Sequence, residues 1–439
     1  MRKILLGLFT LLLIISTKPS QASHLLGGEI TWECLTSGTN SGDMIFTLKL
    51  YRACIGIGLP GSATITNPLY ATYGGTSSIT VSRTEQNDLS PGCYDVTKQL
   101  NCTGSTAQRQ NVMEEHVYVS SNVQINGVPA AGGSAFFYTS CCRPASTYMN
   151  NITGSGYWLR AVMFPYTPPG QTSPLSIGTS TGGGTCYDSS PYFAERPATI
   201  ICTGYPFTYN HNAVDEELDS LHYDWTLPMQ SATNGITWKT GYSTTSQLPG
   251  TYHNTMNVPA TLNSLTGEIS FTAFSPQGNY HSTAIKVTSY KCRQKVAEIY
   301  RDIPVVLLAC PPTPTLPPLA NTPPAVLFKW AANATVNIPL PAGDTVLAGD
   351  SVNFYITSTD VQFLPGFTPQ TNYLLPSGSQ FGTKFADTLN GCKYPPCAIL
   401  DTNNVFWNDS ASWWEGNFGV ATRFSWKTDC NHLAQVNAC

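Results

Sequence analysis

Charged side chains are scarce in this sequence of 439 residues, of which only 11% are Asp, Glu, Lys or Arg. The 22 basic residues stand against 26 acidic ones, so the net charge is −4. A nucleic-acid-binding protein needs a basic surface, and this composition therefore predicts no nucleic-acid partner. Long runs with the 3.6-residue period of a helix are also missing beyond the N-terminus, which argues against a helical fold.

Long apolar runs are missing too, except at the N-terminus. Arg2 and Lys3 precede an apolar stretch over residues 4–15, and Ser20-Gln21-Ala22 offers the small side chains of a cleavage site. This order is typical of a secretory signal peptide, which we place at residues 1–22. The stretch is too short to span a bilayer. We expect a secreted, extracellular protein at the cell surface, with no membrane span after the signal is removed.

Motifs of metal-dependent and nucleophilic catalysis are absent or incomplete. The sequence has no C-x2-C pair and no H-E-x-x-H motif. Residues 178–182 fit the G-x-S-x-G pattern, but a glycine-rich stretch follows where the nucleophile elbow needs a helix. We therefore predict no catalytic residue and no enzymatic activity.

Turn-forming residues are abundant, with 36 glycines and 32 prolines. Between them lie short segments in which bulky and small residues alternate, such as residues 30–35, 45–51, 202–209 and 282–292. This pattern predicts many short strands joined by turns. The fold class that we predict is all-β, built from tandem disulfide-containing β-sandwiches of the immunoglobulin or cadherin type.

Fourteen cysteines fit an oxidising compartment, where disulfides persist. We expect all of them to form disulfides: Cys34, Cys54, Cys93, Cys102, Cys141, Cys142, Cys186, Cys202, Cys292, Cys310, Cys392, Cys397, Cys430 and Cys439. Their parity suggests domain boundaries, because closed frameworks need even numbers. Six cysteines precede residue 186, four lie within residues 186–310, and four follow. The connectivity within each set stays open.

The predicted domains follow from this parity and from the loops. An N-terminal β-sandwich covers residues 23–185, an immunoglobulin- or cadherin-like sandwich covers 186–310, and a proline-rich linker covers 311–325. A third β-sandwich covers residues 326–439. It lacks a closing strand, so we expect further domains or a partner strand beyond Cys439.

The densest group of carboxylates lies in the loop that joins two predicted strands around residues 202–225. Asp215, Glu217 and Asp219 belong to this loop. Oxygen-rich loops suit Ca²⁺, which takes six to eight hard ligands. The alternative is a solvated turn in which the side chains bond their own backbone, and the spacing of an EF-hand is absent. Calcium is the one cofactor that the sequence suggests.

Trp407, Trp413 and Trp414 form an aromatic group in the last domain. Aromatic faces stack on ligands such as sugars, and this group is a candidate ligand-binding platform. The alternative is packing within the core and at the edge of a sandwich.

Several segments together resemble the gliding-motility-associated and adhesin-like surface proteins of Bacteroidota. They are the opening S-H-L-L-G-G-E-I and the strand K-L-Y-R-A-C, the segment A-F-F-Y-T-S-C-C-R at residues 135–143, and E-I-Y-R-D-I-P-V-V-L-L at 298–308. The family's acidic loop commonly reads D-x-D-G-D-S-L. Asp215, Asp219 and Ser220 match it, whereas Glu217 and Leu218 replace an Asp and a Gly.

The resemblance implies a secreted protein of β-sandwich domains, with members often exported by the type IX system through a C-terminal sorting domain. No such domain is recognisable in this sequence. We therefore expect a non-catalytic cell-surface adhesin or structural spacer that binds an unidentified surface glycan or protein. The alternative is a carbohydrate-binding module or an accessory part of a secreted hydrolase.

Overall fold

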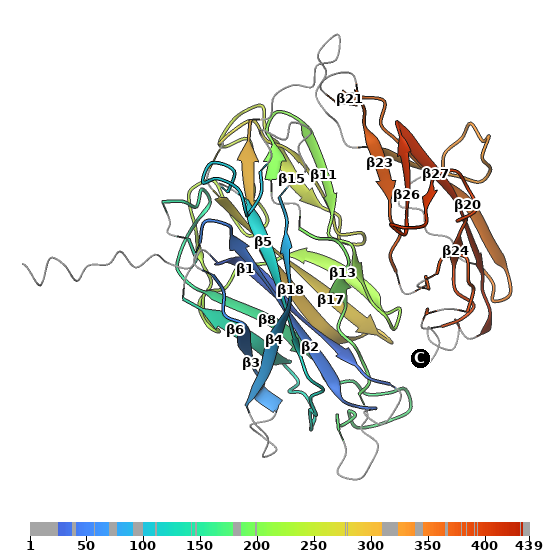
Figure 1. Cartoon of the computed structure of the whole chain (residues 1–439). Helices are drawn as coiled ribbons and strands as arrows, with labels where there is room; N and C mark the ends of the chain where they lie inside the picture. Colours follow the sequence, from blue (N-terminus) through green and yellow to red (C-terminus); the bar gives the residue numbers. More distant parts are fainter. Residues whose placement is uncertain are drawn as a thin grey trace, which may run out of the picture.

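The computed structural model is built from β-strands, as the sequence predicts (Figure 1). It describes residues 25–36, 41–56, 58–69, 77–90, 100–109, 112–141, 143–144, 147–178, 186–197, 200–276, 278, 280–309, 324–338, 346–364, 368–378, 380–382, 384–389, 391–392, 394–430 and 432. The predicted signal peptide, most of the predicted linker and residues 179–182 of the G-x-S-x-G pattern lie outside these ranges. No helix among the described residues has the length and apolar character needed to cross a membrane.

One large sheet dominates the structure. Its strands follow the order β1 (Leu25–Cys34), β2 (Met44–Ala53), β5 (Met113–Ser120), β4 (Ser78–Asp88), β3 (Ser62–Thr66), β6 (Ser134–Ser140), β8 (Tyr157–Met163), β18 (Gln294–Leu308), β17 (Tyr280–Lys291) and β13 (Ser220–Trp225). Strand β10 (Ile200–Cys202) runs parallel to the end of β18. All other pairings within this sheet are antiparallel.

The strands form where apolar residues alternate with polar ones. In β2, Met44, Phe46, Leu48 and Leu50 are buried, whereas the residues between them are half-buried. A period of two places these four side chains on one face of the sheet, against the core. The strands predicted at residues 30–35 and 45–51 lie within β1, except for residue 35, and within β2, and the two pair in antiparallel fashion.

A second layer covers part of the large sheet. It consists of β11 (Pro206–Asn210), β16 (Glu268–Thr272) and β15 (Val258–Leu262). Ile269 and Phe271 of this layer belong to the same core cluster as Ile285 and Val305 of the large sheet. Two short pairs complete this part of the chain, β9 (Tyr192–Phe193) with β12 (Ala213–Val214), and β7 (Ile152–Thr153) with β14 (Thr237–Trp238).

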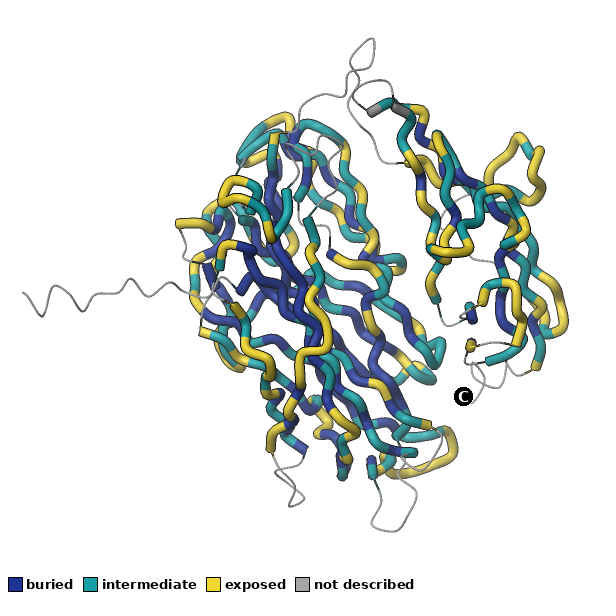
Figure 2. Tube along the Cα trace, viewed as in Figure 1, coloured by how far each residue is buried: buried dark blue, intermediate teal, exposed yellow. Residues whose placement is uncertain are grey.

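The large sheet crosses the domain boundary that we predicted at residue 185. Strand β8 pairs with β18, and one core cluster contains residues from both sides of the boundary. Figure 2 shows the buried strands as a continuous block in this body. The predicted ranges 23–185 and 186–310 are therefore not two separate packing units. Cysteine parity does not locate a domain boundary here, because it assumes that no disulfide joins two domains, and Cys34 bonds Cys186 across the predicted boundary.

The other predicted disulfides have mixed outcomes. Cys54 bonds Cys102, and Cys392 bonds Cys397. Cys141, Cys202 and Cys292 are also in disulfides. Cys430 departs from the prediction, because it is a free, exposed thiol in the structure. Four predicted disulfide cysteines lie outside the described residues: Cys93, Cys142, Cys310 and Cys439.

The strands after residue 324 form a separate pair of sheets, drawn in orange and red in Figure 1. The first contains β19 (Ala325–Lys329), β20 (Ser351–Thr359), β27 (Gly419–Lys427) and β24 (Ile399–Leu400). The second contains β23 (Thr371–Leu374), β26 (Trp413–Asn417) and β25 (Trp407–Asn408), and a short pair joins β21 (Phe363–Leu364) to β22 (Thr368–Pro369). Phe424 of the first sheet and Trp414 of the second share a core.

Candidate functional site

The acidic loop lies between β12 and β13, and part of it is buried. Asp215 is only 5% exposed. Its Oδ1 accepts a hydrogen bond from the backbone N–H of Asp219 at 3.0 Å, and its Oδ2 accepts one from the hydroxyl of Ser289 at 3.1 Å. Leu218 takes the left-handed conformation with a φ of 63°, which costs a residue with a Cβ about 1–2 kcal/mol. The loop therefore makes this turn with a leucine where the family pattern has a glycine.

A fourth carboxylate, that of Asp188, joins this loop from the segment that precedes β9. Asp188 is 3% exposed, and neither of its carboxylate oxygens accepts a hydrogen bond. The neighbouring Ser189 donates a hydrogen bond from its hydroxyl to Oε1 of Glu217 at 3.0 Å, which ties the two segments together. We call Asp188, Asp215, Glu217 and Asp219 the acidic cluster.

Among the described residues, Lys291 at the end of β17 is the cation that forms ion pairs with the acidic cluster. Its Nζ lies 2.8 Å from Oδ2 of Asp219 and 3.4 Å from Oδ1 of Asp188. The Lys291 side chain is 17% exposed. One ammonium group thus faces four carboxylates, which leaves a deficit of positive charge when all four are ionised.

Burial and mutual repulsion shift the proton equilibria of the acidic cluster. Burial raises the pKa of Asp188 well above 3.8, and the charge of Asp215 raises it further. Burial raises the pKa of Asp215 to about 7, with a contribution from the charges of Asp219 and Glu217. Burial alone lowers the pKa of Lys291, but the nearby carboxylates outweigh this effect and raise it. Lys291 is therefore charged, while Asp188 and Asp215 hold protons more tightly than exposed aspartates do.

Ion pairs and hydrogen bonds link the four carboxylates, and the oxygens of Asp188 have no hydrogen-bond donor. Among the described residues, however, no three members of this cluster place oxygens within 4.8 Å of one another, as the ligands of one metal ion would lie. The positive group present between Asp188 and Asp219 is the Lys291 ammonium, which occupies part of the space that a metal would take. Calcium binding at Asp215, Glu217 and Asp219 stays a prediction. No sequence pattern points to Asp188 or Lys291, because only the fold brings them to the loop.

A second group of buried charges lies where the large sheet closes on itself. Strand β1 also pairs with β18, through Gly28 and Asp302. This approach needs bare backbone, because a Cβ on Gly27 would lie 1.9 Å from the carbonyl oxygen of Asp302. The order of strands therefore returns from β18 to β1, and we call this junction the seam.

Two arginine–carboxylate pairs flank the seam. Arg301 of β18 donates from Nε to Oε2 of Glu29 at 2.5 Å and from a terminal nitrogen to Oε1 at 3.2 Å. Arg143 donates to both carboxylate oxygens of Asp302, at 2.6 and 3.2 Å. Both arginines are fully enclosed, and each lies over an aromatic ring, Arg301 over that of Phe193 and Arg143 over that of Tyr157.

These four charged residues come from the segments that carry the family resemblance. Glu29 belongs to the opening S-H-L-L-G-G-E-I, Arg143 to the S-C-C-R segment, and Arg301 and Asp302 to E-I-Y-R-D-I-P. Burial raises the pKa of Glu29, but the positive charges of Arg301 and Lys49 outweigh it and hold this pKa below its usual value. The Glu29–Arg301 pair is thus ionised, and both pairs join residues far apart in the sequence.

The predicted tryptophan platform is not a single surface. Trp414 is fully buried, its ring lies 4.5 Å from that of Trp407, and its Nε1 donates to the carbonyl of Asp401 at 2.8 Å. Trp407 is half-buried. Trp413 is 36% exposed and meets the ring of the exposed Tyr373 edge-on at 5.6 Å. Packing is therefore the role of Trp414, and Trp413 is the member with an open ring.

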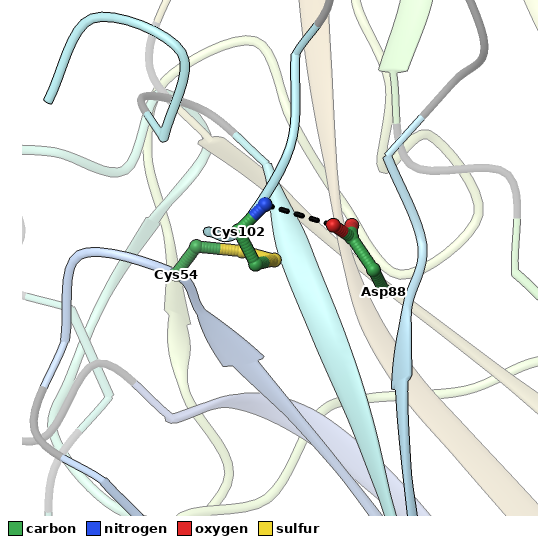
Figure 3. A group of neighbouring side chains, drawn as sticks. All are labelled: Cys54, Asp88 and Cys102. Carbon is green, nitrogen blue, oxygen red and sulfur yellow. Dashed lines mark hydrogen bonds between the residues drawn. A yellow bond between two sulfur atoms is a disulfide. The ribbon is translucent and has the colours of Figure 1, made fainter. Parts of the chain in front are cut away.

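Cys54, Asp88 and Cys102 are the three potential metal ligands that lie closest together among the described residues (Figure 3). The two sulfurs bond each other, so neither cysteine offers a thiolate. Asp88 accepts a hydrogen bond from the backbone N–H of Cys102 at 2.8 Å. This group holds a loop in place and has no free thiolate with which to bind a metal.

Comparison with protein families, with curated proteins and with solved structures found no match. The function is therefore inferred from the acidic cluster, the seam and the surfaces of this chain.

Proposed function

We propose that this chain is a secreted, non-catalytic protein of the cell surface that serves in adhesion or as a structural spacer. The observation that carries the proposal is the seam. It pairs β1 with β18 and so links the first and a late strand of the large sheet. Force applied to either end of this sheet therefore meets antiparallel hydrogen bonds and two buried ion pairs.

The use of charge supports a structural role. The carboxylates of Glu29 and Asp302 are each taken by a guanidinium group, which satisfies them and holds them in place. Removing one partner of such a pair costs about 3–5 kcal/mol, so these residues are committed to stability. The disulfides Cys34–Cys186 and Cys54–Cys102 limit unfolding in an oxidising medium. A spacer or adhesin needs this durability.

A flow experiment tests the proposal. Beads coated with residues 23–439 pass over surfaces coated with mucin, with cellulose or with a control protein, and the released medium is assayed for reducing sugars and amino groups. We expect retention on a coated surface without release of products. Retention equal to that of uncoated beads contradicts adhesion, and products that accumulate with time contradict a non-catalytic role.

A further inference from the structure

A groove of about 610 Å³ opens beside the loop that connects β13 to β15. Its walls include the rings of Trp238, Tyr242 and His253, together with Asn150 and the hydroxyls of several threonines. The rings of Tyr242 and His253 lie 4.1 Å apart. Neither the acidic cluster nor the tryptophans of the last domain belong to this groove.

The connecting loop covers residues 226–257 and contains the two-residue strand β14. Connections of this length are uncommon in compact domains and usually have a function. The loop is nevertheless firmly tied to the sheet. The fully buried Gln247 accepts a hydrogen bond from the N–H of Ala284 at 2.6 Å and donates to the carbonyls of Thr226 and Ala284.

Two more buried amides hold the same loop. Asn151 donates to the carbonyl of Gln247 at 2.8 Å and to that of Ser282 at 2.7 Å. Asn257 accepts a hydrogen bond from the N–H of Phe274 at 2.7 Å and donates to the carbonyl of Gly250 at 3.1 Å. The aromatic walls are thus fixed before any ligand arrives, which lowers the entropy cost of binding.

Gly241 shows how closely the aromatic rings pack. Its φ is 87°, and a Cβ there would lie 2.3 Å from the ring of Tyr252 and 2.7 Å from that of His253. The rings therefore rest on bare backbone at the base of the loop. Tyr252 remains 69% exposed and extends the aromatic surface outward.

The groove is nearly free of charge. Its one ammonium group, that of Lys239, donates to the carbonyl of Met149 at 2.5 Å. Burial lowers the pKa of His253, so its imidazole is neutral at physiological pH. Flat rings surrounded by hydroxyl and amide groups match a ligand with apolar C–H faces and many hydroxyls.

We propose that this groove binds a neutral oligosaccharide, with the rings of Trp238 and Tyr242 as the stacking surface. The proposal depends on the binding role given above and assigns a ligand class to it. A proline-rich peptide also packs on aromatic grooves, but the threonines and Asn150 around these rings offer more hydrogen-bonding groups than such a peptide uses.

The test is an array printed with neutral and acidic oligosaccharides, probed with residues 23–439. We expect binding to neutral glycans. Thr240→Arg, at an exposed position in the groove wall, should reduce it about tenfold or more by filling the groove without removing a packed ring. Trp238→Ala should also reduce it. Trp330→Ala, which removes a tryptophan that is 58% exposed and lies outside the groove, is the matched control and should have no effect.

Several outcomes overturn the proposal. They are binding to no neutral glycan, binding that Thr240→Arg leaves unchanged, and loss of binding in Trp330→Ala. The proposal is also overturned if a labelled peptide with the sequence of residues 311–323 binds more tightly than any neutral glycan and Thr240→Arg abolishes this binding. The groove would then be a peptide site. Beads coated with the Thr240→Arg variant separate the two proposals. If these beads still adhere in the flow experiment and the array shows no bound glycan, the groove assignment is refuted and the proposed adhesive role is not.

Discussion

Replacing Lys291 by Met tests the electrostatics of the acidic cluster most directly. Coulomb's law with an effective dielectric constant of about 20 gives an attraction of roughly 5 kcal/mol for each of the ion pairs that Lys291 forms with Asp219 and Asp188. Desolvation of the ammonium offsets much of this attraction. We therefore expect Lys291→Met to lower the free energy of unfolding by about 3 kcal/mol at pH 8, as when one partner of a buried pair is removed.

The loss should depend on pH. The pKa of Asp215 is raised to about 7 and that of Asp188 is also raised, so both aspartates favour folding when they are protonated. Their contribution is complete below the unfolded value near 4, and that of Asp215 is lost as the pH rises through about 7. At pH 5 fewer negative charges remain, and the cost of Lys291→Met should fall to about 1 kcal/mol.

Urea denaturation with the disulfides kept oxidised, followed by hydrogen exchange of the amides in β17, measures both values. Lys286→Met is the matched control on the same strand, because Lys286 pairs with the exposed Asp224 at 3.3 Å and with Glu298 at 3.5 Å. It should cost less than about 1 kcal/mol at either pH. An equal loss for Lys291→Met at pH 5 and pH 8 would refute the reasoning.

Three further predictions concern other groups. If the acidic cluster binds Ca²⁺, calorimetric titration at pH 8 should show uptake that Asp188→Asn weakens, and an unchanged melting temperature in EDTA argues against it. Burial raises the pKa of Glu114, but hydrogen bonds from His116, Arg52 and Gln86 outweigh it and lower this pKa to about 2. Glu114→Gln removes the charge that these bonds stabilise and should lower the free energy of unfolding by about 3 kcal/mol at pH 7. That contribution is present above the ordinary value of 4.5 and is lost as the pH falls towards 2, so thermal melts should converge there. Replacing both Cys34 and Cys186 by Ala should cost about 3–5 kcal/mol, because their disulfide closes a long loop, and a urea midpoint that does not move would contradict this.

Local sequence patterns predicted the strands well. The alternation in residues 45–51 places Phe46 and Leu48 on the buried face of β2, and the strand predicted at residues 282–292 lies within β17 except for its last residue, Cys292. Such patterns depend on neighbours in the chain, so they report which face is buried and not which distant strand lies alongside. The pairing of β8 with β18 and the Cys34–Cys186 disulfide were therefore not predictable in this way.

The candidate site was predicted only in part for the same reason. Asp215, Glu217 and Asp219 stand out because they are close in sequence. Asp188 is a single polar residue before β9 and Lys291 is the last residue of β17, and their role depends on a loop that the fold brings to them. The groove beside Trp238 was not predictable from the sequence, because its aromatic residues are dispersed over a long loop without a recognisable motif.

The seam has a consequence for the order in which the chain can mature. Glu29 and Arg143 are made early in synthesis, whereas Arg301 and Asp302 emerge much later. Until β18 is available, the first strands lack their closing neighbour, and two charged groups lack their counter-ions. Non-local pairing of this kind slows folding. If such a polypeptide crossed a membrane from its N-terminus, the large sheet could not close until residue 308 had crossed. Folding of this body would then be completed only on the far side of the membrane.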